Sequence, residues 1–321
     1  MAERLVGIAR LAATGASLDS KREVEYRQLP TFKLLNRCTS PDMPFDWTIN
    51  PYRGCEIGCK YCYARYTHEF MERREPDAFE REIFAKQWNR ADFLKDLRRI
   101  EPGSRIAIGT ATDPYQPAER RYGVTRSILE VFAERSGYRV GITTKSDFVT
   151  RDIDVLRAAS RGNRVSVHLT ITTVDAALAR KLEPRAPRPD LRLAAVKRLS
   201  EAGIDVGVFA SPVLPLITDS DAQLEALFAA ARDAGARFVV ANPVFLMPCA
   251  LRVFLPFLET EFPRLATRYR DRFTKQPYLR GDYAERLRGR IARLRERFGM
   301  ASRSESRDDA PWPETAQLSL F

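Results

Sequence analysis

Short apolar runs alternate with segments of helical spacing over most of the chain. The apolar runs predict strands at 47–50, 106–109, 140–143, 165–171, 206–210 and 238–241, with a possible further strand at 83–85. Apolar residues three or four positions apart predict helices at 125–135, 152–160, 191–202 and 221–234. Strands that alternate with helices indicate a parallel sheet covered by helices. The sequence therefore predicts an α/β barrel, complete or partial, with six core strands in residues 45–243.

The segments on either side of this core have a different character. Residues 1–44 are expected to be an irregular leader that Pro30, Pro41 and Pro44 punctuate. Residues 244–300 are expected to form a helical basic extension, with a helix or loop at 251–258 and an apolar stripe of Leu287, Ile291, Leu294 and Phe298. Residues 301–321 are rich in Ser, Arg, Asp and Pro and are expected to be disordered.

Charge is unevenly distributed along the chain. The net charge is +11, and residues 264–307 carry 14 Lys/Arg against 5 Asp/Glu, which gives +9 in that segment. A basic patch of this size suggests a polyanionic partner, most often nucleic acid, although a solvated helical surface is the alternative. No stretch has the roughly 20 apolar residues of a membrane helix, and no secretory signal is recognised.

Three of the five cysteines fall within eight residues, Cys55, Cys59 and Cys62, in a C-x3-C-x2-C arrangement. An odd number with this clustering does not suit a secreted disulfide framework and fits a reducing cytoplasm. Three thiolates on a short loop can hold three corners of a [4Fe–4S] cluster and leave one iron open. Gly54 and Gly58 would let the backbone wrap closely around the cluster. The alternative is a structural zinc site with His68 as fourth ligand.

The motif, with Tyr61 before the third cysteine, resembles the signature of the radical S-adenosylmethionine (SAM) superfamily. The resemblance implies a partial six-stranded α/β barrel with this loop after the first strand. It also implies that SAM chelates the open iron through its amino and carboxylate groups. One electron from the cluster would then cleave SAM to a 5′-deoxyadenosyl radical, which abstracts hydrogen from a substrate.

A closer resemblance covers roughly residues 45–260. The segments NPYRGC, GTATDPYQPAE, TKS, RDID, LEPRAP and AGIDVGV are similar to the spore photoproduct lyase-related, DNA-repair-photolyase-like branch. Polar residues follow the strands, where α/β barrels place their chemistry, although Thr and Ser also cap helices. The family pattern and this placement together predict the SAM contacts: Asp113 or Glu119 for the amino group, Lys145 for the carboxylate, Thr170 or Thr172 for the ribose and the Tyr61 backbone near the adenine, with Thr112 in the same strand-end set.

The sequence departs from that branch in one respect. Spore photoproduct lyases have a hydrogen-donating cysteine near the third or fourth strand, and this chain has none there. Cys249, after the last predicted strand, is the candidate donor, and a buried structural cysteine is the alternative.

The last five residues, Gln317-Leu318-Ser319-Leu320-Phe321, resemble the short motif that binds the bacterial sliding clamp of DNA replication. In that motif the glutamine forms hydrogen bonds, and Leu318, Leu320 and Phe321 would fill an apolar cleft. The alternative is a terminus that folds back on the barrel.

These features together predict a cytoplasmic radical SAM enzyme that acts on DNA, by lesion repair or base modification. The 264–307 segment would bind DNA, and a flavodoxin- or ferredoxin-type protein would supply electrons. Two alternatives stay open: radical modification of RNA or protein, and a zinc-stabilised nucleic-acid-binding module without catalysis.

Overall fold

The computed structural model describes residues 5–21, 23–31 and 33–301. Within these residues the chain forms two compact units, which are described separately. The first contains the chain up to Ile57 together with Thr67–Val167, and the second contains Gly58–Tyr66 and the chain from His168 onward. No helix in these ranges is long and apolar enough to cross a membrane.

The first unit contains a four-stranded sheet. Its strands lie in the order β1-β2-β6-β5, namely β1 (Ser17–Lys21), β2 (Val24–Leu29), β6 (Glu82–Lys86) and β5 (Tyr52–Arg53). The β2–β6 pair is parallel, and the two outer pairs are antiparallel. The possible strand at 83–85 is thus confirmed as β6.

Residues 1–44 are not an irregular leader, and that prediction is wrong for the part that the structure describes. Helix α1 (Gly7–Thr14) buries Ala9 and Ala12, and a short strand, β3 (Leu35–Arg37), follows β1 and β2. Ala12 joins Leu29, Met71 and Phe84 in a small apolar core. The segment is ordered by packing against residues more than fifty positions away, which local patterning does not reveal.

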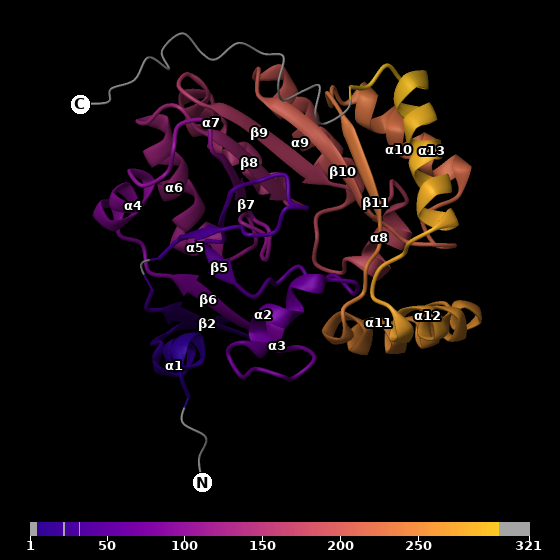
Figure 1. Ribbon diagram of the computed structural model, residues 1–321, viewed down its shortest axis with the longest axis horizontal. Helices are drawn as coiled ribbons and strands as arrows, with labels where there is room; N and C mark the ends of the chain where they lie inside the picture. The colour runs from indigo at the N-terminus through magenta and orange to yellow at the C-terminus, as the bar shows by residue number, and fades with distance from the viewer. Residues whose placement is uncertain (1–4, 22, 32, 302–321) are drawn as a thin grey trace. The chain divides into compact units, whose positions relative to one another are not determined.

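The second sheet of the first unit has the order β3-β4-β7-β8-β9, with β4 (Trp47–Ile49), β7 (Arg105–Ile108), β8 (Arg139–Thr144) and the start of β9 (Arg164–Thr170). β4, β7 and β8 pair in parallel, whereas β3 is antiparallel to β4. Helices α4 and α6 lie side by side (Figure 1). The helices of this unit are α3 (Ala78–Arg81), α4 (Arg90–Leu97), α5 (Glu119–Tyr122), α6 (Val124–Ala133), the 3₁₀ turn η2 (Asp147–Asp152) and α7 (Ile153–Ser160).

The second unit contains the end of β9 beside β10 (Asp205–Val213) and β11 (Val239–Pro243), of which β10 and β11 pair in parallel. Helices α11 and α12 lie side by side. Its helical segments are η1 (Tyr63–Arg65), α8 (Ala176–Leu182), α9 (Pro189–Glu201), α10 (Asp221–Asp233), α11 (Pro248–Glu261), α12 (Pro263–Lys275) and α13 (Asp282–Arg297). Helix α2 (Tyr66–Glu69) starts at the last residue of the 58–66 segment.

The predicted α/β architecture is confirmed. Each predicted core strand and each predicted helix has a counterpart within a few residues. The strands are short, largely buried runs, and the helices bury residues three or four positions apart. The apolar stripe at the C-terminal end is also found, since Leu287 and Ile291 of α13 are each 2% exposed and Phe298 packs near Phe228. Residues 302–321, with the expected disordered tail and the clamp-like motif, lie outside the described residues.

Candidate active site

The first unit holds the N-terminal half of the cysteine loop through its backbone. The Cys55 amide donates to the Phe79 carbonyl at 2.8 Å, and the Cys55 residue is buried. Gly54 has φ +79°, and a Cβ there would lie 2.7 Å from the Glu82 carbonyl oxygen and 2.9 Å from that of Phe79. Only glycine accommodates this backbone without displacing its neighbours.

The same half-loop is tied to the segment that follows β7. The Gly54 carbonyl accepts from the Thr112 hydroxyl at 2.6 Å and from Gln116 Nε2 at 3.0 Å. The Glu56 amide donates to Gln116 Oε1 at 3.0 Å. Gln116 is fully buried, so its amide fixes the loop at two successive peptide groups.

The second unit holds the C-terminal half of the loop. The Lys60 amide donates to the Leu182 carbonyl at 3.0 Å, and Arg65 Nη2 donates to the Cys59 carbonyl at 3.1 Å. Cys59 is buried and Cys62 is half-buried. Gly58 has a positive φ, +70°, which lets the loop turn between Cys55 and Cys59.

A buried ionic network fixes Tyr61 within this half-loop. The Tyr61 hydroxyl donates to Glu183 Oε1, which also accepts from the Thr172 hydroxyl at 3.1 Å. Glu183 Oε2 lies 2.5 Å from Arg192 Nη2, and both side chains are almost completely buried. Burial lowers the pKa of Arg192, but the Glu183 carboxylate, together with Tyr61 and Cys59, raises it overall, so the guanidinium stays charged.

No motif or spacing in the sequence identifies Arg192, and Glu183 is recognisable there only as part of the LEPRAP segment. Arg192 also donates through Nη1 to the Thr170 carbonyl at 2.9 Å and through Nε to the Pro187 carbonyl at 2.7 Å. The network therefore joins the end of β9, α8 and α9 to Tyr61, which directly precedes Cys62.

The donor set of the cysteine loop fits an iron–sulfur cluster. None of the five cysteines forms a disulfide bond, and three of them lie in the loop. In the described ranges no three His, Cys, Asp or Glu side chains gather closely enough for a single metal ion. A cubane has no need of that arrangement, because each thiolate binds a separate iron.

His68, the fourth ligand of the alternative zinc site, has a structural environment. It is 1% exposed, its Nε2 donates to the Glu82 carbonyl at 2.9 Å, and its ring contacts Phe79 and Phe84 edge-on. Its Nε2 thus supports α2 against β6 in the first unit.

Asp113 and Lys145 follow the neighbouring strands β7 and β8. Asp113 accepts from the Thr144 hydroxyl at 2.6 Å and from the amides of Tyr115 and Lys145 at 2.9 and 2.7 Å. Burial raises the pKa of Asp113, against the hydrogen bonds and the Lys145 charge, which lower it. These are three donors among the described residues, whereas a carboxylate has about four acceptor positions. Asp113 therefore keeps capacity for one further donor.

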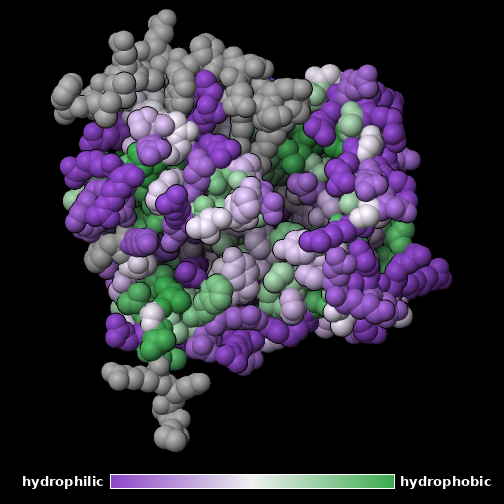
Figure 2. Space-filling model, viewed as in Figure 1, coloured by the Kyte–Doolittle hydropathy of each residue, from purple (hydrophilic) through white to green (hydrophobic). Residues whose placement is uncertain are grey.

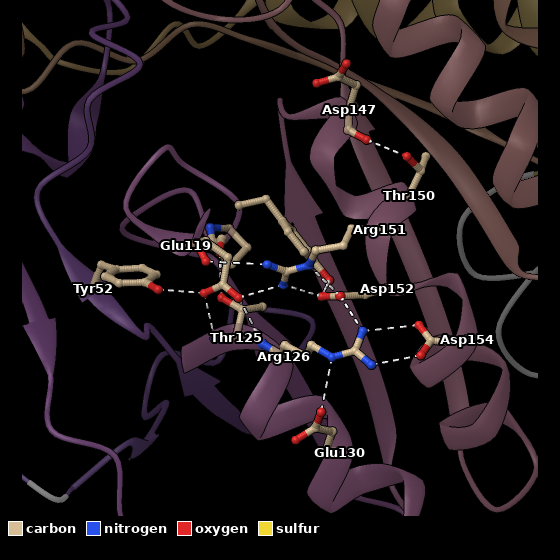
Figure 3. Close-up of polar contacts among 12 residues, drawn as sticks. Tyr52, Glu119, Thr125, Arg126, Glu130, Asp147, Thr150, Arg151, Asp152 and Asp154 are labelled. Atoms are coloured by element: carbon tan, nitrogen blue, oxygen red, sulfur yellow. Dashed lines mark hydrogen bonds and ion pairs between the residues drawn. The ribbon is translucent and has the colours of Figure 1, made fainter. Parts of the chain in front are cut away.

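Glu119, the second acid predicted at the SAM amino group, has no such capacity. It is fully buried and accepts from the Tyr52 hydroxyl, the amides of Thr125 and Arg126, and Arg151 Nη2, at 2.5 to 3.1 Å. Figure 3 shows Arg151 reaching both Glu119 and Asp152, while Arg126 bridges Asp152 to Asp154 and Glu130. The four donors give Glu119 the geometry of an anchor for α5, α6 and η2.

The remaining predicted residues lie at strand ends or beside the loop. Thr170 ends β9, and the Thr172 hydroxyl donates to Glu183. Cys249, in the first turn of α11, is 6% exposed, and its Sγ lies 3.9 Å from the Tyr63 carbonyl oxygen. Tyr63 directly follows Cys62, so this thiol packs against the end of the cysteine loop.

Comparison with known proteins identifies the family of this chain. Residues 49–228 match the family model of the radical SAM superfamily. An uncharacterized protein of Mycobacterium tuberculosis is 35% identical over 281 residues, which are 87% of this chain and 80% of that protein. An uncharacterized protein of Methanocaldococcus jannaschii is 31% identical over 61% of this chain and 71% of its own length.

Solved structures agree in fold. Spore photoproduct lyase complexed with dinucleoside spore photoproduct superposes with a TM-score of 0.64 and 18% identity, over 85% of this chain and 79% of that one. A variant of that lyase with bound AdoMet gives a TM-score of 0.59 at 18% identity, over 82% and 76%. The α/β fold is therefore similar to that of spore photoproduct lyase. The family model matches more than half of the sequence, and this chain belongs to the radical SAM superfamily.

Proposed function

We propose that this radical SAM enzyme acts on DNA, by lesion repair or base modification. The observation that supports its SAM site best is the acid–base pair Asp113 and Lys145 at the ends of β7 and β8. Asp113 has capacity for one more donor, and the Lys145 side chain lies close enough to lower the Asp113 pKa. One carboxylate beside one ammonium is complementary to the zwitterionic amino-acid end of SAM.

The remaining cofactor contacts are part of the same proposal and rest on the family pattern and the positions of these residues at strand ends. Cys55, Cys59 and Cys62 would hold a [4Fe–4S] cluster, which with bound SAM supplies the 5′-deoxyadenosyl radical. Asp113 binds the SAM amino group and Lys145 the carboxylate, and Thr170 or Thr172 binds the ribose near the Tyr61 backbone. The hydrogen bond from Thr112 to Gly54 keeps the strand-end segment and the cysteine loop in fixed register.

An anaerobic assay of 5′-deoxyadenosine tests the enzymatic part. The reconstituted, dithionite-reduced protein is expected to produce it from SAM, and the Cys59→Ala variant is not. Lys145→Met is expected to raise the KM for SAM at least about tenfold, the value of one charged contact of about 1.4 kcal/mol or more. Lys197→Met removes a lysine whose side chain is 65% exposed and serves as the matched control. A colourless, zinc-loaded protein that leaves SAM intact would overturn the assignment of the cluster and SAM.

The basic helices α12 and α13 support DNA as the target. Each buries a narrow apolar face, Ala266, Tyr269 and Phe273 in α12 and Ala284, Leu287 and Ile291 in α13. Four exposed arginines have guanidinium groups without a hydrogen bond or ion pair to any described residue: Arg264, Arg268, Arg288 and Arg293. Figure 2 shows a largely hydrophilic surface where these two helices lie. Unpaired guanidinium groups on a hydrophilic face suit phosphate binding.

A salt titration tests this surface. Removing two phosphate contacts with Arg288→Ala/Arg293→Ala is expected to reduce the slope of log affinity against log salt by roughly 2. The matched control is Arg157→Ala/Arg198→Ala, which removes two exposed arginines outside these helices whose guanidinium groups likewise have no hydrogen bond or ion pair to a described residue. Equal slopes for both double variants would exclude α13 as the DNA surface.

Cys249 is proposed as the hydrogen donor that completes the reaction. Its S–H bond would break as a C–H bond forms on the substrate radical, and the thiyl radical left behind would take an electron and a proton, with a flavodoxin- or ferredoxin-type protein as the electron source. The contact of Cys249 with Tyr63 at the end of the cysteine loop supports this role. Cys249→Ala should still produce 5′-deoxyadenosine while substrate turnover stops, and unchanged turnover would leave Cys249 a structural residue.

The last residues carry a separate proposal, because they lie outside the described part of the chain. Gln317, Leu318, Leu320 and Phe321 would bind the bacterial sliding clamp and bring the enzyme to replicating DNA. A pull-down with the clamp, compared with Leu320→Ala/Phe321→Ala, tests this partner. Retained binding in the double variant would remove the clamp from the proposal.

A further inference from the structure

Three aromatic rings of the second unit stand in a row that begins at the cysteine loop. The Tyr63 and Phe245 ring centroids are 5.0 Å apart, and those of Phe245 and Tyr278 are 5.3 Å apart at an interplanar angle of 19°. Tyr63 follows Cys62, Phe245 lies just after β11, and Tyr278 lies in the segment between α12 and α13 (Figure 1). We call these three residues the aromatic row.

The backbone fixes the outer end of the aromatic row. Phe245 and Tyr278 form an antiparallel bridge, and the Leu246 amide donates to the Pro277 carbonyl at 2.9 Å. Tyr278 is nevertheless 45% exposed, whereas Tyr63 and Phe245 are half-buried. The Tyr278 ring is thus held in a stacked geometry against Phe245, in a residue that remains substantially exposed to solvent. A pre-set, exposed aromatic face is suited to stacking a planar ligand at low entropic cost.

Cationic residues lie close to Tyr278 along the sequence. Arg272 Nη2 donates to the Tyr278 carbonyl at 3.4 Å, and Lys275 and Arg280 are exposed, with no ion pair among the described residues. An exposed aromatic ring beside cationic side chains is the combination that binds single-stranded nucleic acid, in which bases stack on rings while cations contact phosphates.

We propose that Tyr278 is a stacking platform for an unpaired nucleobase and that the aromatic row extends from it to the cysteine loop. The inference rests on the proposed action on DNA and names the part of the nucleic acid that this surface takes. A base that has left its stack would find at Tyr278 a replacement partner for its lost neighbours.

Binding titrations that vary both residue 278 and the nucleic-acid strand test the stacking platform. The holoprotein and its variants are titrated with a short fluorescent oligothymidylate and with a strand of equal length made of abasic residues. Tyr278→Leu keeps apolar volume and removes the aromatic face, and Tyr278→Phe keeps that face. Tyr278→Leu is expected to weaken oligothymidylate binding by roughly 5- to 100-fold and to leave abasic binding unchanged. Tyr278→Phe should bind both strands like the wild type.

The outcomes separate this inference from the proposed function. If the wild type binds oligothymidylate but Tyr278→Leu binds it equally well, or loses both strands equally, stacking at Tyr278 is refuted and DNA remains the target. If the wild type binds neither strand, the DNA target fails and the platform fails with it. Thermal unfolding of each variant shows whether the segment between α12 and α13 has kept its fold.

Discussion

Loss of Arg192 should destabilise the protein far more than loss of an arginine in an exposed ion pair. The Arg192 side chain is 1% exposed, and its removal leaves the fully buried Glu183 carboxylate without its cation. It also leaves the carbonyls of Thr170 and Pro187 without a donor. Breaking a buried pair on one side costs about 3–5 kcal/mol of unfolding free energy. At about 2–4 °C for each kcal/mol, Arg192→Met should lower the melting temperature by roughly 10 °C.

The matched control is the exposed ion pair Arg188–Asp190 at the N-terminus of the same helix. Arg188 Nη2 lies 2.9 Å from Asp190 Oδ2, and the two side chains are 61% and 55% exposed. Such a pair contributes about 0–1 kcal/mol, so Arg188→Met should change the melting temperature by no more than a few degrees. Calorimetry of the anaerobically reconstituted protein measures both variants. The double variant Glu183→Leu/Arg192→Met removes both charges and should recover much of the loss. Equal effects of Arg192→Met and Arg188→Met would refute the description of this pair as a buried ionic anchor.

Three further predictions follow from the first unit. Gly54→Ala places a Cβ 2.7 Å from the Glu82 carbonyl oxygen, so the iron content after reconstitution should fall. The control is Gly203→Ala, at a position with a similar φ of +76° and open space, and its iron content should stay well above that of Gly54→Ala. Equal iron content in the two variants would contradict the clash. Glu119→Gln should cost about 2–4 kcal/mol of unfolding free energy by urea titration, since it weakens four hydrogen bonds and leaves Arg151 less well paired; a loss under 1 kcal/mol would contradict its anchoring role. Burial, with Arg53 nearby, lowers the pKa of Lys86 from 10.5 to about 7. Between these pH values the unfolded chain binds one proton more than the folded protein, so the free energy of unfolding should rise from pH 7 to 10.5 by at most about 5 kcal/mol. Lys86→Met should abolish that rise, and an unchanged pH profile would exclude Lys86 as its source.

The strands could be predicted because their signal is local. β7 and β8 are short apolar runs that end in polar turns, and nothing else in their surroundings is needed to recognise them. β1 and β2 could not be recognised in the same way, because neither is an apolar run: SLDSK is mostly polar, and VEYRQL is half polar. Their order comes from pairing with each other and of β2 with β6, more than fifty residues away. Register between distant strands leaves little trace in one sequence.

In the candidate site, too, local motifs can be recognised from the sequence and contacts between distant residues cannot. The three cysteines could be singled out as candidate ligands because their motif is contained in eight residues. The partner of Tyr61 could not be recognised from the sequence, since Glu183 is 122 positions away. Nor could the cation that pairs with Glu183, because Arg192 lies on a helix that periodicity describes only as amphipathic. A buried ion pair of this kind becomes visible only when the fold brings its members together.

Burial and acceptor capacity also separate two acids that the sequence could not rank. Asp113 and Glu119 both follow β7, and either could have met the SAM amino group. Glu119 uses its four acceptor positions on protein donors and is fully buried. Asp113 accepts from three donors and has Lys145 next to it in space. A ligand ammonium can be accepted at Asp113 without breaking a bond of the fold, whereas at Glu119 it would have to displace one. The two neighbours thus differ: Glu119 holds the helices in place, whereas Asp113 keeps the acceptor position that the proposed contact with the SAM amino group requires.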